Sequence, residues 1–77
     1  MVDFILFGTA GCHLCEEAEA LLTAAGIGFD SKDIIDDEQC QQQYGLLIPV
    51  LLHQASGQQL NWPFDRIQLT DFVRQTG

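Results

Sequence analysis

Two cysteines three residues apart, Cys12 and Cys15, are the residues of this chain best suited to chemistry. They follow a loop that contains Gly8 and Gly11, at the point where a helical pattern begins. Unpaired backbone N–H groups and the helix dipole stabilise negative charge there, so we expect the pKa of Cys12 to lie below the ordinary value of about 8.5. Helical residues three apart have Cβ atoms about 5–6 Å apart, and modest adjustment lets their sulfurs bond.

Such a pair predicts an enzyme, a thiol–disulfide oxidoreductase. The Cys12 thiolate would attack a substrate disulfide and form a mixed disulfide with it. Cys15, deeper in the helix, would then attack Cys12 and release the reduced substrate. An external thiol system would reduce the resulting intramolecular disulfide.

The charges next to the pair act in opposite directions. His13 lies between the cysteines and, when protonated, would favour the Cys12 thiolate, whereas the glutamates at positions 16, 17 and 19 would disfavour it. We expect the helix terminus to dominate because it is nearest; an exposed histidine without a role is the alternative for His13. Cys40 is predicted to be a packed, inert thiol, with a regulatory or intermolecular disulfide as its alternative.

Hydrophobic periodicity predicts the elements that position the cysteines. The apolar run over 2–7 is typical of a strand buried on both faces. A helix follows up to Gly26, with a predicted apolar stripe of Leu14, Ala18, Leu21, Leu22 and Ala25. The later elements are a strand over Ile27–Asp33, a short helix capped by Asp36, a strand over Val50–His53, a hairpin strand over Gln58–Asn61, and a final helix capped by Asp65. The apolar face expected for that last helix consists of Ile67, Leu69, Phe72 and Val73.

This order predicts an α/β fold: a βαβ unit, a helix, a β-hairpin and a helix, forming a four-stranded mixed sheet with helices packed on it. Seventy-seven residues are enough for one small domain, which we expect to span residues 1–77. No apolar run approaches the roughly 20 residues of a membrane helix, and the first residues lack the basic stretch of a secretory signal. We therefore expect a cytoplasmic protein.

The net charge of the chain limits the classes of partner that it can bind. Eleven acidic residues against three basic ones give a formal net charge of −8, so nucleic acid and anionic membranes are not expected as partners. We interpret the acidity mainly as solubility, with steering toward a basic protein as the alternative. The small size and the charge favour a monomer.

The sequence resembles the thioredoxin-fold superfamily and, within it, the glutaredoxin-like proteins. The resemblance rests on Gly11-Cys12-His13-Leu14-Cys15 at a helix start and on Ile48-Pro49-Val50 before a strand, and the order of elements extends it over nearly the whole chain. It implies that Pro49 follows a cis peptide bond and faces the redox pair, and that the Ile48 backbone pairs with a substrate backbone. The predicted substrate-binding residues are Gly11, His13, Ile48, Pro49 and Asp65.

Two stretches depart from the glutaredoxin pattern. Residues 9–11 lack the basic residue that meets glutathione carboxylates, and residues 61–65 replace a Gly-Gly-x-Asp-Asp loop, leaving Asp65 to cap the helix or to meet an amino group. Glutathione, itself anionic, would be poorly held by so acidic a chain. The predicted substrate is a disulfide-containing protein or a small thiol compound, with a thioredoxin or glutathione system as reductant. No cofactor is expected besides glutathione as a candidate co-substrate.

Two other classes of function stay open. A metal or iron–sulfur site would use Cys12, Cys15 and His13, or a cluster shared by two chains through Cys12. One C-x-x-C supplies only two of the four ligands that tetrahedral zinc usually takes, so Cys40 or His53 would have to converge on it. The third class is a non-catalytic module that holds a peptide in the same groove.

Overall fold

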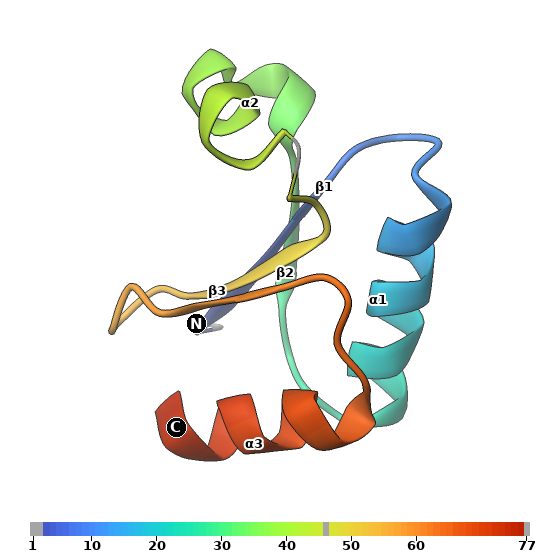
Figure 1. The fold of residues 1–77 in the computed structure, drawn as a ribbon, viewed down its shortest axis with the longest axis vertical. Coiled ribbons are helices and arrows are strands. Elements are labelled where there is room, and N and C mark those ends of the chain that lie inside the picture. The colour runs from blue at the N-terminus through green and yellow to red at the C-terminus, as the bar shows by residue number, and fades with distance from the viewer. Residues whose placement is uncertain (1–2, 46, 77) are drawn as a thin grey trace.

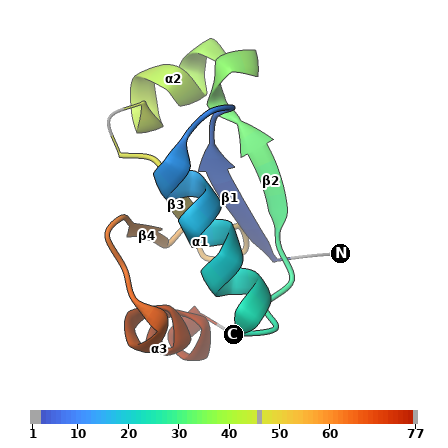
Figure 2. The same cartoon turned by 90° about the vertical axis from the view of Figure 1, so that its right-hand side faces the viewer.

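The computed structural model describes residues 3–45 and 47–76. In chain order its elements are β1 (Phe4–Gly8), α1 (His13–Ala24), β2 (Asp30–Asp33), the 3₁₀ helix η1 (Ile34–Asp36), α2 (Glu38–Tyr44), β3 (Val50–His53), β4 (Gln59–Asn61) and α3 (Arg66–Thr76). The strands form one sheet in the order β2-β1-β3-β4 (Figures 1 and 2). β1 and β2 pair in parallel and the other pairs are antiparallel, which confirms the predicted mixed sheet.

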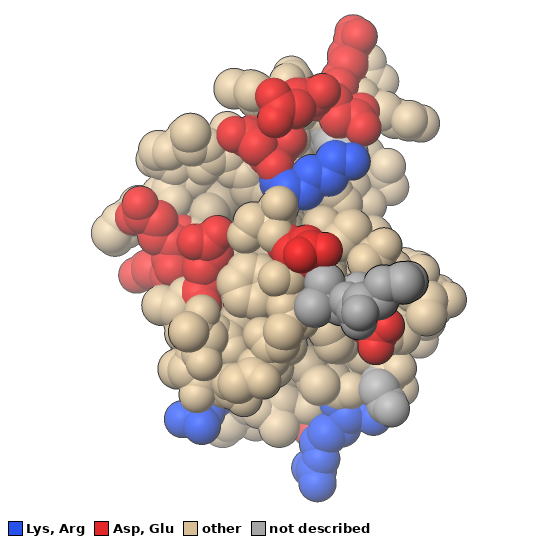
Figure 3. Space-filling model, turned by 180° about the vertical axis from the view of Figure 1, so that it is seen from behind, with Lys and Arg blue, Asp and Glu red and all other residues tan. Residues whose placement is uncertain are grey.

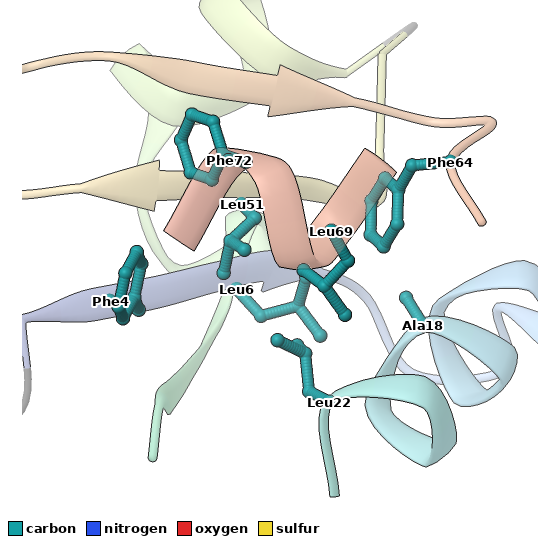
Figure 4. Close-up of a cluster of buried hydrophobic side chains, with 8 residues drawn as sticks. All are labelled: Phe4, Leu6, Ala18, Leu22, Leu51, Phe64, Leu69 and Phe72. Atoms are coloured by element: carbon teal, nitrogen blue, oxygen red, sulfur yellow. The ribbon is translucent and has the colours of Figure 1, made fainter. Parts of the chain in front are cut away.

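The central strand β1 is covered on both faces, as its apolar run predicts. One face carries Leu6 and packs against α1 and α3. Figure 4 shows that the sheet residues Leu6 and Leu51 meet the helix residues Leu22 and Leu69 there. On the other face the ring of Phe7 stacks on that of Tyr44 from α2, with centroids 4.4 Å apart. The sheet therefore fixes the position of α1 and of the loop that leads into it.

The second strand is shorter than predicted. It begins at Asp30 and not at Ile27, because the Ile27 N–H donates to the Leu22 carbonyl oxygen at 3.0 Å instead of joining the sheet. Gly26, at φ +71°, ends the helix as predicted. The residues that follow serve to bring the chain to the sheet edge, while Ile27 and Phe29 pack against the core.

The predicted cap of α2 was wrong by one residue. Asp36 lies within η1, and the Asp37 side chain accepts the Gln39 N–H at 2.9 Å. Asp33 caps η1 by accepting the Ile35 N–H at 3.0 Å. This short turn was not predicted, and it moves the start of α2 to the next aspartate.

Two predicted apolar positions face solvent. Leu14 is 44% exposed and Ile67 is 75% exposed, so neither belongs to the buried face of its helix. In α1 the buried residues are Cys15, Ala18 and Leu22. The buried face of α1 thus includes a cysteine where the stripe had predicted a leucine. No helix within residues 3–45 and 47–76 is long and apolar enough to cross a membrane.

Candidate active site

A tight turn brings the chain from β1 into α1. The Cys12 N–H donates to the Thr9 carbonyl oxygen at 3.2 Å, which closes a four-residue turn. Gly11 has φ +79°, a conformation that glycine adopts at little cost. Cys12 has extended backbone angles and is the N-cap residue of α1. The glycine loop therefore places the first sulfur at the helix start, as predicted.

The two sulfurs lie against the first turn of α1. They are bonded to each other as a disulfide, with Cα atoms 5.2 Å apart. The Cys15 N–H also donates to Cys12 Sγ at 3.1 Å. Cys12 is partly exposed whereas Cys15 is only 7% exposed. A substrate arriving from solvent would therefore meet Cys12 first, and Cys15 is reached through it.

Gly8 makes room for the buried sulfur. A Cβ at this position would lie 2.9 Å from Cys15 Sγ, closer than Cβ atoms approach other atoms in proteins, and 3.1 Å from Cys15 Cβ, which is a tight contact. Gly8 is the last residue of β1, so the missing side chain lets α1 come close to the sheet at this point. The sequence indicated a loop glycine that allows a tight turn and the approach of another backbone, whereas the close neighbour is the Cys15 side chain. A glycine at the end of a buried strand, four residues before Cys12, is the signal for this contact.

A hollow of about 290 Å³ adjoins the disulfide. It lies between the start of α1 and the edge strand β2, and both Cys12 and Cys15 line it together with Gly11. The far wall includes Ser31 and Lys32, which the sequence did not indicate as site residues. Their place depends on the pairing of β2 with β1, which local patterns do not reveal.

The His13 side chain is exposed and does not line this hollow, although its contact Glu16 does. Its Nδ1 lies 3.7 Å from Glu16 Oε2, and both side chains are largely exposed. His13 is thus next to the cysteines in sequence, with a carboxylate as its contact in space.

Ile48 and Pro49 lie at the same sheet edge as the cysteines. Val50 faces Phe7 in the β1–β3 pairing, so Pro49 lies beside Gly8 at the end of β1. The Ile48–Pro49 peptide bond is cis, and Pro49 is buried. The Ile48 N–H already donates to the Tyr44 carbonyl oxygen at 3.1 Å, so this N–H is occupied within the chain, and the pairing of Ile48 with a substrate backbone stays a prediction.

Asp65 lies apart from the other predicted residues. Its side chain accepts the Gln68 N–H at 2.8 Å, and its own N–H donates to Gln68 Oε1 at 3.1 Å. This reciprocal pair caps α3. Figures 1 and 2 show α3 beside the end of α1 that is farther from the β1–α1 loop. The structure therefore gives Asp65 its capping role and does not bring it to the hollow.

His53, one of the two residues proposed as further metal ligands, lies away from the cysteines. Within the described parts of the chain, no three His, Cys, Asp or Glu side chains are grouped so as to hold a metal ion. His53 is buried opposite Phe4, at the end of β3 away from the cysteines, and its Nδ1 lies 2.7 Å from Ser56 Oγ. The Cys40 side chain is outside the described part of the structure, so its predicted packing stays a prediction.

A mixed sheet flanked by helices, with a C-x-x-C at the start of the first helix, defines a thioredoxin-like α/β fold of the glutaredoxin type. The family comparison agrees with it: the model of the Glutaredoxin-like domain (DUF836) matches residues 3–74. The chain belongs to this family. No match was found among curated proteins.

Solved structures show the same fold. The X-ray structure of protein XcR50 from X. campestris is 36% identical, with a TM-score of 0.87, over 96% of this chain and 99% of that one. The solution structure of XcR50 gives 34% identity and the same TM-score, over 99% of this chain and 97% of that one. Protein Ne2328 from Nitrosomonas europaea, at 24% identity and a TM-score of 0.78 over 91% of this chain and 88% of that one, shares the fold.

Proposed function

We propose that this protein is a thiol–disulfide oxidoreductase in which Cys12 attacks and Cys15 resolves. The observation that carries the proposal is the hydrogen bond from the Cys15 N–H to Cys12 Sγ, beside a hollow that both sulfurs line. A backbone donor aimed at a sulfur stabilises its thiolate more than its thiol, and the dipole of α1 acts in the same direction. We therefore expect the pKa of the Cys12 thiol to be lowered by its place at the helix start.

The first chemical step uses the partly exposed sulfur. In the reduced protein the Cys12 thiolate attacks one sulfur of a substrate disulfide. A new bond forms between Cys12 Sγ and that sulfur, and the substrate's S–S bond breaks with release of a thiolate. The turn at Gly11 holds Cys12 at the rim of the hollow, where this attack is sterically open.

The second step uses the buried sulfur. Cys15 loses its proton and attacks Cys12 Sγ, which breaks the mixed disulfide and releases the second substrate thiolate. The two electrons that reduce the substrate come from the two cysteines, which end as a disulfide. In the bonded pair the Cα separation of 5.2 Å lies within the usual range for a disulfide, so the first turn of α1 accommodates this product.

The reductant that restores the dithiol is proposed to be a thioredoxin-type system and not glutathione. The turn over residues 9–11 has no cation, and the Lys32 ammonium at the hollow lies 3.6 Å from Asp37 Oδ2. A tripeptide with a net negative charge finds little to hold it there. We propose that the protein acts as a monomer and that its substrate is a disulfide-containing protein or a small disulfide. Its proposed location is the cytoplasm, where thiol systems keep cysteine pairs reduced.

Trapping of the mixed disulfide tests the proposal. In a Cys40→Ser background, so that the third thiol takes no part, the reduced protein should reduce 2-hydroxyethyl disulfide with multiple turnover when a dithiol donor is supplied. Cys15→Ser should stop at a stable adduct that carries one substrate half, seen as added mass. Cys12→Ser should form neither adduct nor product, because the remaining thiol is buried.

The Cys12→Ser and Cys15→Ser variants control for each other, since both remove one sulfur. An adduct that forms on Cys15 as fast as on Cys12 would contradict the assigned order of attack. Absence of exchange in the dithiol protein, with a folded state verified by circular dichroism, would contradict the proposed function itself. Parallel turnover assays with glutathione and with a thioredoxin system identify the donor.

A further inference from the structure

The hollow beside the disulfide has acidic walls. Glu16 and Glu19 line it from α1, and Asp33 lines it from β2. Glu16 is four residues after Cys12, and Glu19 is four residues after Cys15. Because residues four apart lie on the same face of a helix, each sulfur has a carboxylate one turn further along the same wall.

One of these carboxylates is oriented by a hydrogen bond, and another has a histidine beside it: the Glu16 carboxylate is largely exposed, with His13 Nδ1 3.7 Å from its Oε2. Glu19 Oε1 accepts a hydrogen bond from the Ser31 hydroxyl at 3.0 Å, which orients this carboxylate across the hollow without removing its charge. The cation in the wall, Lys32, has its ammonium 3.6 Å from Asp37 Oδ2. Its charge is therefore partly compensated by an aspartate that does not line the hollow.

The surface around the hollow is also mainly negatively charged. Eight of the eleven acidic residues lie between positions 16 and 38, where Lys32 is the one Lys or Arg in the sequence. Arg66 and Arg74 lie on α3. Figure 3 shows most acidic side chains over the α2 end and the side of α1, with one basic side chain beside them at the α2 end and the others at the α3 end. A clefted surface of one sign raises the local concentration of ligands of the opposite sign.

We propose that the hollow selects disulfides that carry a positive charge close to the reacting sulfur, such as an aminoalkyl disulfide or a protein disulfide flanked by lysine or arginine. This inference rests on the proposed oxidoreductase function and specifies its substrate class. The substrate cation lies between Glu16 and Glu19 while its sulfur meets Cys12 Sγ. The protein dithiol gives two electrons to the substrate, whose S–S bond is replaced by two thiols, and ends as the Cys12–Cys15 disulfide.

Three small disulfides of different charge test the inference: cystamine with two ammonium groups, 2-hydroxyethyl disulfide with none, and 3,3′-dithiodipropionate with two carboxylates. The reduced Cys40→Ser protein is mixed anaerobically with each, quenched with acid, alkylated and analysed by mass. Each rate is divided by that of dithiothreitol with the same disulfide, which removes the intrinsic reactivity of the substrate. We expect normalised rates to fall from cystamine to dithiodipropionate by about tenfold or more at low salt, with a smaller difference at high salt.

Glu17 provides a matched control for the carboxylates. It lies on the same turn of α1 and is exposed, but it does not line the hollow. The double variant Glu16→Gln/Glu19→Gln should lose most of the preference for cystamine, whereas Glu17→Gln should keep most of it. Equal normalised rates for the three disulfides, or an equal loss in Glu17→Gln and in the double variant, would overturn the inference. Failure to react with any of the three would instead overturn the proposed function, and the substrate class with it.

Discussion

The close approach of Gly8 to Cys15 makes a sharp prediction for Gly8→Ala. The new methyl group would lie 2.9 Å from Cys15 Sγ and 3.1 Å from Cys15 Cβ, whereas contacts between carbon atoms are most favourable at about 3.5–4.0 Å. The φ angle of Gly8 is not in the positive range, so alanine meets only this contact and no backbone strain. Extra methyl groups in a packed site typically cost about 1–3 kcal/mol.

The cost of Gly8→Ala should fall mainly on the oxidised protein. There the bond to Cys12 holds Cys15 Sγ in place. In the reduced protein we expect the Cys15 thiol to rotate away from the new methyl group. A destabilisation of about 1–3 kcal/mol of the disulfide form corresponds to a midpoint potential about 20–60 mV less negative for a two-electron couple. The sign follows because a disulfide that is harder to form is a stronger oxidant.

The measurement is an equilibrium titration of wild type and Gly8→Ala in dithiothreitol redox buffers, with acid quench, alkylation and mass analysis. The control places Gly8→Ala in a Cys15→Ala background, where no sulfur meets the new methyl group. In urea unfolding, the destabilisation caused by Gly8→Ala should be smaller in that background than in the oxidised protein. An unchanged potential, or an equal destabilisation in the two backgrounds, would refute the assigned role of Gly8.

Two further predictions concern the scaffold. Asp65→Ala removes the side chain that caps α3 and should lower the free energy of unfolding by about 0.5–2 kcal/mol, measured by urea titration, with Asp65→Asn retaining most of it; an unchanged stability would speak against the cap. Leu22→Ala leaves a cavity where α1 and α3 meet the sheet, since Leu22 is fully buried, and should cost about 2–5 kcal/mol in the same assay. Leu14→Ala, at a half-exposed position of the same helix, is its control and should cost much less, whereas comparable losses would contradict the observed orientation of α1.

The arrangement of the redox pair was largely predictable from local sequence. A glycine-containing loop between a strand and a helical stripe places Cys12 at the N-cap wherever the rest of the chain lies. The parallel pairing of β1 and β2 follows from the helix that joins them. These features depend on short-range sterics and hydrogen bonds, which sequence patterns report well.

Other features depend on tertiary packing. The predicted apolar stripe of α1 begins at Leu14, but Leu14 is exposed and Cys15 is buried in its place. The lack of a side chain at Gly8 leaves the room that Cys15 occupies against the sheet. From the sequence, Asp36 and Asp37 are equally suitable caps for α2. Asp36 lies within η1, so Asp37 is the residue that precedes the helix. The acidic wall needs β2 placed beside α1, so the bond between Ser31 and Glu19 has no local signal in the sequence.

Alkylation of a single-thiol protein measures whether the start of α1 keeps Cys12 ionised. Cys15→Ser/Cys40→Ser retains the backbone donor at residue 15 and leaves Cys12 as the one reactive thiol. Its rate of reaction with iodoacetamide is measured between pH 4 and 10, with free cysteine as reference. We expect the midpoint of the rate profile to lie clearly below the ordinary thiol pKa of about 8.5. A midpoint at or above that value, in a folded protein, would contradict it.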